Sequence, residues 1–196
     1  MPSSRLVCGA GLSLLAALAP ALAPAAERAI DKQVVVAADV DAVWAARTTR
    51  EGITSFFAPD AEVEARVGGA SHGVIDPLTA PGARDADDVR CMALQPERMP
   101  SFDWNAPPFL PKARSQRSFV NVRLEPVDAN HTRVRLHHTG WSDGGQWAAA
   151  LTCFDRAWGS VLSNLKTRLE SGPQHGTGCL AQLRAMHAAA AAKAQP

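Results

Sequence analysis

The sequence predicts one α+β domain in which a curved antiparallel sheet wraps around a long C-terminal helix, the arrangement called a helix grip. Residues 61–136 alternate polar and apolar side chains with the period of strands. Residues 145–171 instead repeat apolar side chains at three- and four-residue steps, as a helix does. All Trp and Phe residues fall between Trp44 and Trp158, so the core is expected in that interval.

The first part of the domain is expected to form one strand and two short helices. Asp39 or Asp41 is suited to cap the first helix, and Thr48 or Thr49 the second, because their side chains accept hydrogen bonds from free backbone N–H groups. The predicted elements are a β-branched strand at 30–36, a helix at 43–47 and a helix at 50–57.

Six further strands are expected to follow as an antiparallel meander. They are predicted at 62–67, 71–75, 89–94, 100–105, 114–125 and 132–138. Gly68-Gly69 marks a turn, and the prolines at 107, 108 and 111 require an edge or loop because proline cannot donate to a ladder. The even-numbered residues of the last two strands share one face, which is expected to point toward the helix.

A long helix from Gly145 to Ser171 is expected to close the domain. Ser142 or Asp143 is suited to begin it, and Gly172-Pro173 ends it. At 1.5 Å per residue it is about 40 Å long, enough to span the whole sheet. Such a fold tends to leave a cavity between sheet and helix, so function depends on the side chains that line this space.

The two ends of the chain differ from the domain in composition. Arg5, an apolar run at 6–19 and small residues at 20–26 predict a secretory signal peptide over residues 1–25, cleaved after Ala25. The alternative is a retained membrane anchor, against which Pro20 and Pro24 count. The mature domain is expected at 27–172, with a partly helical or disordered tail at 173–196. If the signal peptide is cleaved, we expect a periplasmic or secreted protein that has no stable membrane span.

Charge and cysteine usage exclude several classes of partner. The 20 basic and 19 acidic residues leave a formal charge of +1, which excludes the basic balance that nucleic acid binding requires. Cleavage would leave Cys91, Cys153 and Cys179, whose spacing fits no metal site. We expect mostly free thiols, with Cys91–Cys153 as the more feasible pair, and neither a metal nor a cofactor.

Several motifs, in order along the chain, resemble the SRPBCC superfamily of START-like and birch-pollen-allergen-like proteins. Within it the sequence is similar to the branch named after the activator of the heat-shock-ninety ATPase. The matching segments are VWAARTTREGI at 43–53, FDWNAPP at 102–108, RSQRS at 114–118, TRVRL at 132–136, HTGW at 138–141 and FDRAWGSVL at 154–162.

The resemblance covers residues 29–172 and implies a helix-grip fold, commonly with a pocket for an apolar ligand. It implies no single activity, because members include lipid carriers, cyclases and co-chaperones. An exported protein would not meet the cytosolic ATPase, so the activity in the branch's name is not expected here. Cys153, where the branch usually has an aromatic residue, and the tail after Gly172 depart from its pattern.

The candidate ligand-binding residues are aromatic or polar side chains expected on the inner face of the sheet or on the helix. Each has a structural alternative: the aromatics as core, His138 as a buried hydrogen-bonded residue, and the polar group at 114–118 as surface. The candidates are Trp44, Phe102, Trp104, Arg114, Gln116, Ser118, His138, Trp141, Trp147, Phe154 and Trp158.

Three functions remain open from the sequence. The first is a monomeric protein that binds a small apolar molecule or lipid between sheet and helix without catalysis, since no nucleophile with its partners is recognisable. The second is a cyclase- or hydratase-like enzyme with His138 as acid/base and Arg114 as anion-holding group. The third is a protein-interaction or co-chaperone-like module that uses the tail and a rim around Trp141.

Overall fold

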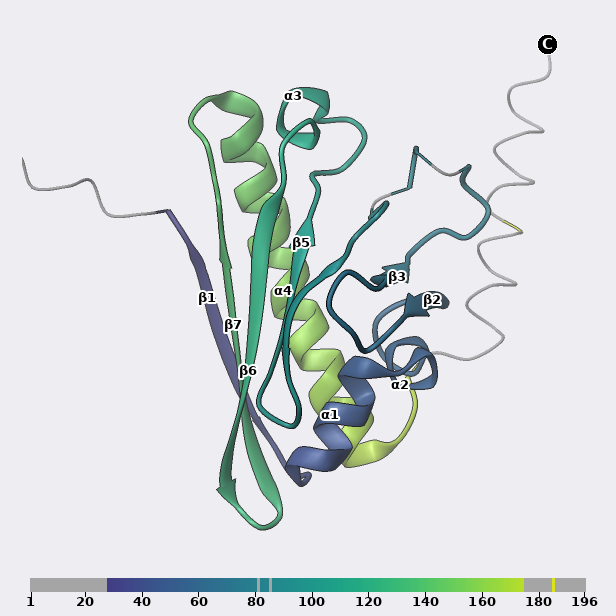
Figure 1. Ribbon diagram of the computed structural model, residues 1–196, viewed down its shortest axis with the longest axis vertical. Helices are drawn as coiled ribbons and strands as arrows, with labels where there is room; N and C mark the ends of the chain where they lie inside the picture. The colour runs from purple at the N-terminus through teal and green to yellow at the C-terminus, as the bar shows by residue number, and fades with distance from the viewer. Residues whose placement is uncertain (1–27, 81, 85, 175–184, 186–196) are drawn as a thin grey trace, which may run out of the picture.

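The computed structural model of the chain describes residues 28–80, 82–84, 86–174 and 185. Its helices and strands follow one another along the chain as shown in Figure 1. They are β1 (Ile30–Val36), α1 (Val40–Thr48), α2 (Arg50–Thr54), β2 (Asp60–Val63), β3 (Ser71–Val74), β4 (Cys91–Gln95), β5 (Met99–Trp104), α3 (Pro111–Arg114), β6 (Ser118–Asp128), β7 (His131–Thr139) and α4 (Gly145–Ser171).

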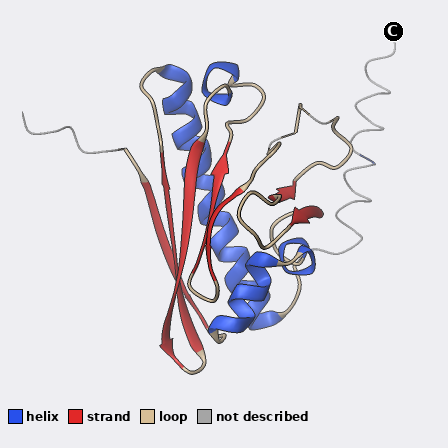
Figure 2. Cartoon of the chain, viewed as in Figure 1, coloured by secondary structure: helices blue, strands red, loops and turns tan. Residues whose placement is uncertain are grey.

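An antiparallel sheet with the strand order β1-β7-β6-β5-β4 holds α4 against one face. Figure 2 shows the sheet on one side of the molecule and α4 running along it, with α1 and α2 beside the C-terminal half of that helix. The arrangement confirms the predicted α+β helix grip. In the central hairpin Val120 lies opposite His138, and Val122 opposite Leu136, so the even-numbered side chains of both strands face the core as predicted.

The expected single meander is wrong in its first part, because β2 and β3 form a separate two-stranded sheet. The bridge between Ala70 and Arg90 and nearby backbone hydrogen bonds connect it to the main sheet. The strand β2 has four residues and ends at Val63, not at Val67 as expected. Gly68, in a positive-φ conformation (79°), lies in the segment that turns the chain from β2 to β3. The small sheet packs against α2 and lies beside the β4–β5 side of the main sheet (Figure 1).

The strand expected at 114–125 begins only at Ser118. Pro111 occupies the first turn of the short helix α3, where its fixed φ favours helical backbone. Arg114 therefore lies on a helix and Gln116 on an exposed turn, so the predicted inward face holds only from Ser118 onward. The start of α4 also differs, since Gly144 and not Ser142 or Asp143 is its N-cap residue.

The predicted caps of the first two helices are confirmed. The Asp39 carboxylate accepts a hydrogen bond from the N–H of Ala42 at 2.8 Å. The Thr49 hydroxyl accepts one from the N–H of Gly52 at 3.0 Å. These caps fix where α1 and α2 begin, and thereby which side chains of α1 turn toward the sheet.

The predicted signal peptide and most of the C-terminal tail lie outside the described residues. Within the described part of the chain, no helix has the length and hydropathy of a membrane span. The helix α4 ends where predicted, at Ser171, with Gly172 in a positive-φ conformation (100°) after it. The N–H of Gln174 then donates to the carbonyl of Ser55, which fixes the first residues after the helix against α2.

Cys91 and Cys153 are both free thiols, in agreement with the expectation of mostly free thiols, and the more feasible pair named from the sequence is not formed. Burial raises the pKa of the Cys91 thiol, whereas Cys153 is exposed on α4. We therefore expect iodoacetamide to alkylate Cys153 in the native protein at least about tenfold faster than Cys91, because the thiolate is the reacting form. Peptide mass mapping under non-reducing conditions checks this, and a disulfide that blocks both residues would contradict it.

Candidate functional site

Aromatic side chains fill the space between the sheet and α4. Trp104 of β5 lies 5.2 Å from Trp158 of α4 between ring centroids, and it meets Phe154 edge-on at 6.5 Å. Phe57, which follows α2, packs against Trp158 at 6.0 Å. The void beside Trp158 holds only about 10 Å³, roughly one water molecule. The ready-formed cavity expected in this space is therefore replaced by packed aromatic rings.

His138 lies at the centre of a completed hydrogen-bond chain. The indole N–H of Trp158 donates to its Nδ1 at 2.9 Å, so that nitrogen is the acceptor. Its Nε2 therefore carries the proton and donates to the Ser118 hydroxyl at 2.7 Å. The Ser118 hydroxyl in turn reaches the carbonyl of Trp104 at 3.4 Å. Both ring nitrogens are used, and the imidazole is held neutral in one tautomer.

Burial and the neighbouring His137 lower the pKa of His138 to about 3. The side chain has no exposed surface, and Trp141 covers it at 4.3 Å between ring centroids. A general base must reach the proton that it abstracts, and this imidazole reaches only Trp158 and Ser118. The geometry thus favours His138 as a buried, hydrogen-bonded residue of the core over His138 as a general base. Ser118 belongs to the same hydrogen-bond chain.

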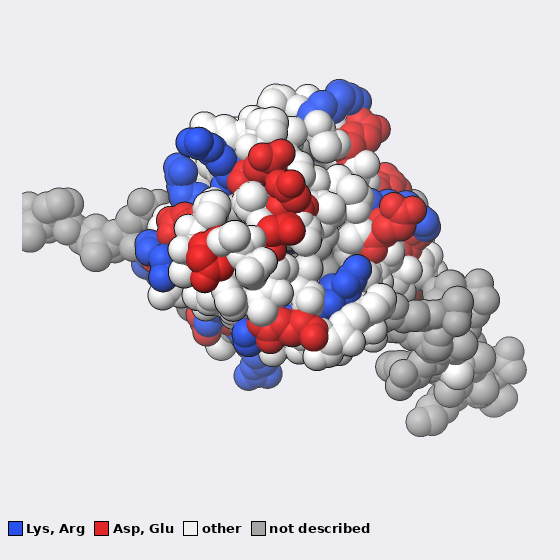
Figure 3. Space-filling model, turned by 90° about the horizontal axis from the view of Figure 1, so that it is seen from below, with Lys and Arg blue, Asp and Glu red and all other residues white. Residues whose placement is uncertain are grey.

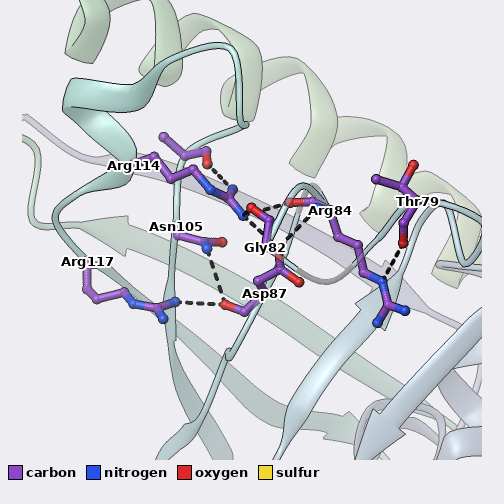
Figure 4. Close-up of polar contacts among 8 residues, drawn as sticks. Thr79, Gly82, Arg84, Asp87, Asn105, Arg114 and Arg117 are labelled. Carbon is purple, nitrogen blue, oxygen red and sulfur yellow. Dashed lines mark hydrogen bonds and ion pairs between the residues drawn. The ribbon is translucent and has the colours of Figure 1, made fainter.

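Arg114 holds the loop between β3 and β4 against the main sheet (Figure 4). Its guanidinium donates to the Asp87 carboxylate at 2.8 Å and to the carbonyls of Ala106 and Arg84 at 2.6 and 2.8 Å. The pair with Asp87 is largely buried. Arg117 donates to the carbonyl of Asp87 at 3.0 Å from the other side. With these bonds made, Arg114 is occupied by the loop and leaves little capacity to hold an anionic ligand.

Breaking this clamp is expected to loosen the loop more than the domain. Asp87→Asn should lower the free energy of unfolding by about 1 kcal/mol and should speed proteolysis between residues 76 and 90 several-fold, because the largely buried guanidinium loses its charged partner. Limited proteolysis with mass mapping checks this. Asp88→Asn is the matched control, since Asp88 is exposed and its pairing with Arg90 is weak at 3.7 Å. Equal cleavage of the two variants would contradict the clamp.

The remaining predicted aromatics are distributed along the helix and the inner face of the sheet. Phe102 is buried and lies 5.8 Å from Trp104, while Trp44 is half-buried on α1. Trp147 is buried and meets Trp141 edge-on at 6.0 Å. Trp141 also donates from its N–H to the carbonyl of His138 at 2.8 Å, so it is fixed inward and does not form a free rim.

Arg47 is the functional candidate that sequence reasoning missed. It lies on α1 and shares a buried face with Val43 and Ala46, with 8% of its surface exposed. Desolvation alone lowers its pKa to about 10, and it forms no ion pair within the described part of the chain. Its guanidinium lies over the Phe102 ring, with 5.4 Å between the guanidinium carbon and the ring centroid. The spacing Val43–Arg47, one helical turn, could have placed this cation on the apolar face.

Three small voids meet at Arg47, each of about 10 Å³. One lies between the small sheet and the β4–β5 edge, one beside Trp158, and one next to Phe57 and Trp104. The indole N–H of Trp104 and the Nε of Arg47 are both buried, and neither finds a hydrogen-bond partner among the described residues. Packing is therefore incomplete around Arg47, and two unpaired donors border the same void.

Other surfaces of the described chain carry weaker signals. A hollow of about 600 Å³ on the outer face of the sheet is open and bordered by polar side chains such as Asp31, Arg123 and His137. Basic and acidic side chains are intermingled on the face shown in Figure 3. Among the described residues, no group of three or more His, Cys, Asp or Glu side chains could hold a metal ion.

The fold and the interior together define a helix-grip α+β protein with an aromatic core and one buried cation. Residues 37–170 match the family described as Activator of Hsp90 ATPase homolog 1-like protein, and the chain belongs to this family, within the SRPBCC superfamily. The resemblance predicted from the sequence motifs is thus confirmed. A comparison with curated proteins found no match.

Solved structures share the fold at low sequence identity. A protein from Mesorhizobium loti is 18% identical, with a TM-score of 0.59, over 73% of this chain and 97% of that one. The Aha1 dimer from Colwellia psychrerythraea is 23% identical, with a TM-score of 0.54, over 74% and 98%. An AHSA1-like protein from Rhizobium etli is 22% identical, with a TM-score of 0.53, over 76% and 86%.

Proposed function

We propose that this protein is an exported, non-catalytic binding protein that takes up a small, largely apolar molecule between the sheet, α1 and the small β2–β3 sheet. The single observation that carries the proposal is the meeting of three voids at Arg47, between the sheet, α1 and the small sheet. The resemblance to the superfamily supports the proposal, because it implies a helix-grip fold that commonly has a pocket for an apolar ligand.

The proposal requires the interior to open, because the voids are too small for a ligand in this conformation. The small sheet is suited to move, since it is connected to the main sheet through residues 68–71 and packs mainly on α2. Elements with few connections to the core open at the lowest free energy. Displacing this sheet would join the void at its edge with the void beside Trp104.

The chemistry of the site favours binding over catalysis. His138 and Arg114, the two residues of the enzymatic alternative, are both engaged in structural hydrogen bonds. The aromatic side chains offer apolar contact area without a reactive group. The monomeric state and the export of the protein are part of the same proposal, and the export rests on the predicted signal peptide.

A thermal-shift measurement with decanol and naphthalene tests the proposal. A probe at a hundredfold excess over its Kd should stabilise the protein by about 2.7 kcal/mol, which raises Tm by roughly 5–10 °C for a chain of this size. Ser71→Leu, which adds a side chain next to two of the voids, should remove most of this shift. Ser163→Leu, the same change on an exposed position of α4, is the control. A wild type without any shift, or Ser71→Leu with a full shift, would contradict the proposal.

A further inference from the structure

Arg47 is a positive charge in an apolar interior for which the described chain supplies no counter-ion. Glu64 borders one of the same voids, but its carboxylate pairs with Arg66 on the surface. The pKa of Arg47 is lowered by desolvation, with no carboxylate acting in the opposite direction. A buried guanidinium in this situation is costly, and a negative group that hydrogen-bonds to it in good geometry offsets part of that cost.

The indole N–H of Trp104 is a second buried donor that needs an acceptor. It has no partner among the described residues, and the Trp104 side chain borders a void together with Arg47. A carboxylate has two oxygens with several acceptor positions, so it can accept from a guanidinium and from an indole N–H together. A neutral or cationic head group would leave the guanidinium unpaired or repel it.

The surroundings of the two donors are apolar. Ile53, Phe57 and Phe102 border the void that holds both donors, and Trp158 and Leu162 border the next one. These side chains suit an aliphatic or aromatic body and offer it no hydrogen-bond partner of their own. A polar, strongly hydrated anion would lose its water here without replacement.

We infer that the molecule bound is an organic carboxylate with an apolar body, its head group held by Arg47 and Trp104 and its body packed among the aromatic side chains between the sheet and α4. This inference rests on the proposed function and names the chemical class of its ligand. The head group enters between the small sheet and the β4–β5 edge, where the void reaches from Ser71 to Leu94.

Isothermal titration of the full chain with decanoate and decanol tests the inference, because the two probes share a body and differ in charge. Decanoate should bind the wild type at least about tenfold more tightly than decanol, since a charge-assisted bidentate pair forms only with the acid. Arg47→Met should lose this preference while its affinity for decanol stays within about threefold, because the substituted side chain conserves volume and apolar contact.

Two further measurements separate the possible outcomes. Glu64→Gln should keep the preference for decanoate unchanged, because Glu64 pairs with Arg66; a gain of about tenfold in decanoate affinity would instead show that Glu64 competes for Arg47 and would overturn the premise that this cation has no counter-ion. If decanol binds and decanoate binds no more tightly, the proposed binding function stands and the carboxylate class is wrong. If neither binds, the proposed function and the inference fail together, and the voids hold water only.

Discussion

Replacing His138 by Phe is expected to lower the free energy of unfolding by about 2–4 kcal/mol, one of the largest losses for a single substitution in this chain. The phenyl ring is somewhat larger than the imidazole, so no cavity forms and crowding in this fully buried site adds to the loss. It removes both ring nitrogens, and the buried N–H of Trp158 and the hydroxyl of Ser118 then lose the partners that they have at 2.9 and 2.7 Å. Urea denaturation at neutral pH measures the loss.

The adjacent residue provides the control. His137 lies on the outer face of the same strand with half of its side chain exposed, and it pairs with the exposed Asp31. His137→Phe should therefore change the free energy of unfolding by no more than about 1 kcal/mol. Similar losses at the two positions would show that the hydrogen-bond chain of His138 contributes no special stability.

The same side chain should make the fold sensitive to acid. Burial holds the pKa of His138 at about 3 in the folded protein, below its ordinary value of 6.5. Between these two values the unfolded chain binds a proton that the folded chain does not, so stability falls as pH falls from 6.5 toward 3. Each pH unit in this window costs at most about 1.4 kcal/mol.

The difference between the wild type and His138→Phe isolates this contribution. Asp128 and Glu170, whose pKa values are lowered by hydrogen bonds from Asn130 and Lys166, also favour the fold at higher pH, but they are present in both proteins. The stability advantage of the wild type should therefore shrink as pH falls from about 7 to about 4. An advantage that stays constant with pH would mean that the imidazole is not held neutral.

Local signals predicted most of the fold. The strand at 30–36, the caps at Asp39 and Thr49, and the helix at 145–171 depend on period, turn residues and capping, all of which are local in the sequence. The division into two sheets was not predicted, because the pairing of β3 with β2 alone depends on how the long loop before β4 is held. That loop is fixed by Arg114 and Asp87, which lie 27 residues apart.

The site was harder to predict than the fold, for a different physical reason. The alternation of polar and apolar residues in β7 placed His138 correctly on the inner face. The partners of its two ring nitrogens lie on other elements, Ser118 on β6 and Trp158 on α4, so they could not be predicted from that alternation. Arg47 was overlooked because arginine side chains are usually exposed, so an arginine on a short helix is expected to face solvent. Its burial follows from its place on the apolar face of α1, which it shares with Val43 and Ala46. The helix predicted from Val43 already includes these positions.

Arg47→Met is expected to raise the free energy of unfolding of the unliganded protein by about 1–3 kcal/mol, the opposite of what most core substitutions do. Methionine fills a similar space and needs no hydrogen-bond partner. The change removes a guanidinium whose burial without a counter-ion lowers its pKa to about 10. The contact with Phe102 that is lost is worth only about 0.5–2 kcal/mol and offsets part of the gain.

The measurement is urea denaturation of the wild type, Arg47→Met and Arg47→Lys without ligand. Arg47→Lys keeps the charge and should bring no gain, because a buried ammonium is at least as costly as a guanidinium. A loss of stability in Arg47→Met would contradict the absence of a counter-ion. A gain there, together with weaker binding of decanoate, would show that Arg47 lowers the stability of the empty protein and strengthens the binding of its ligand.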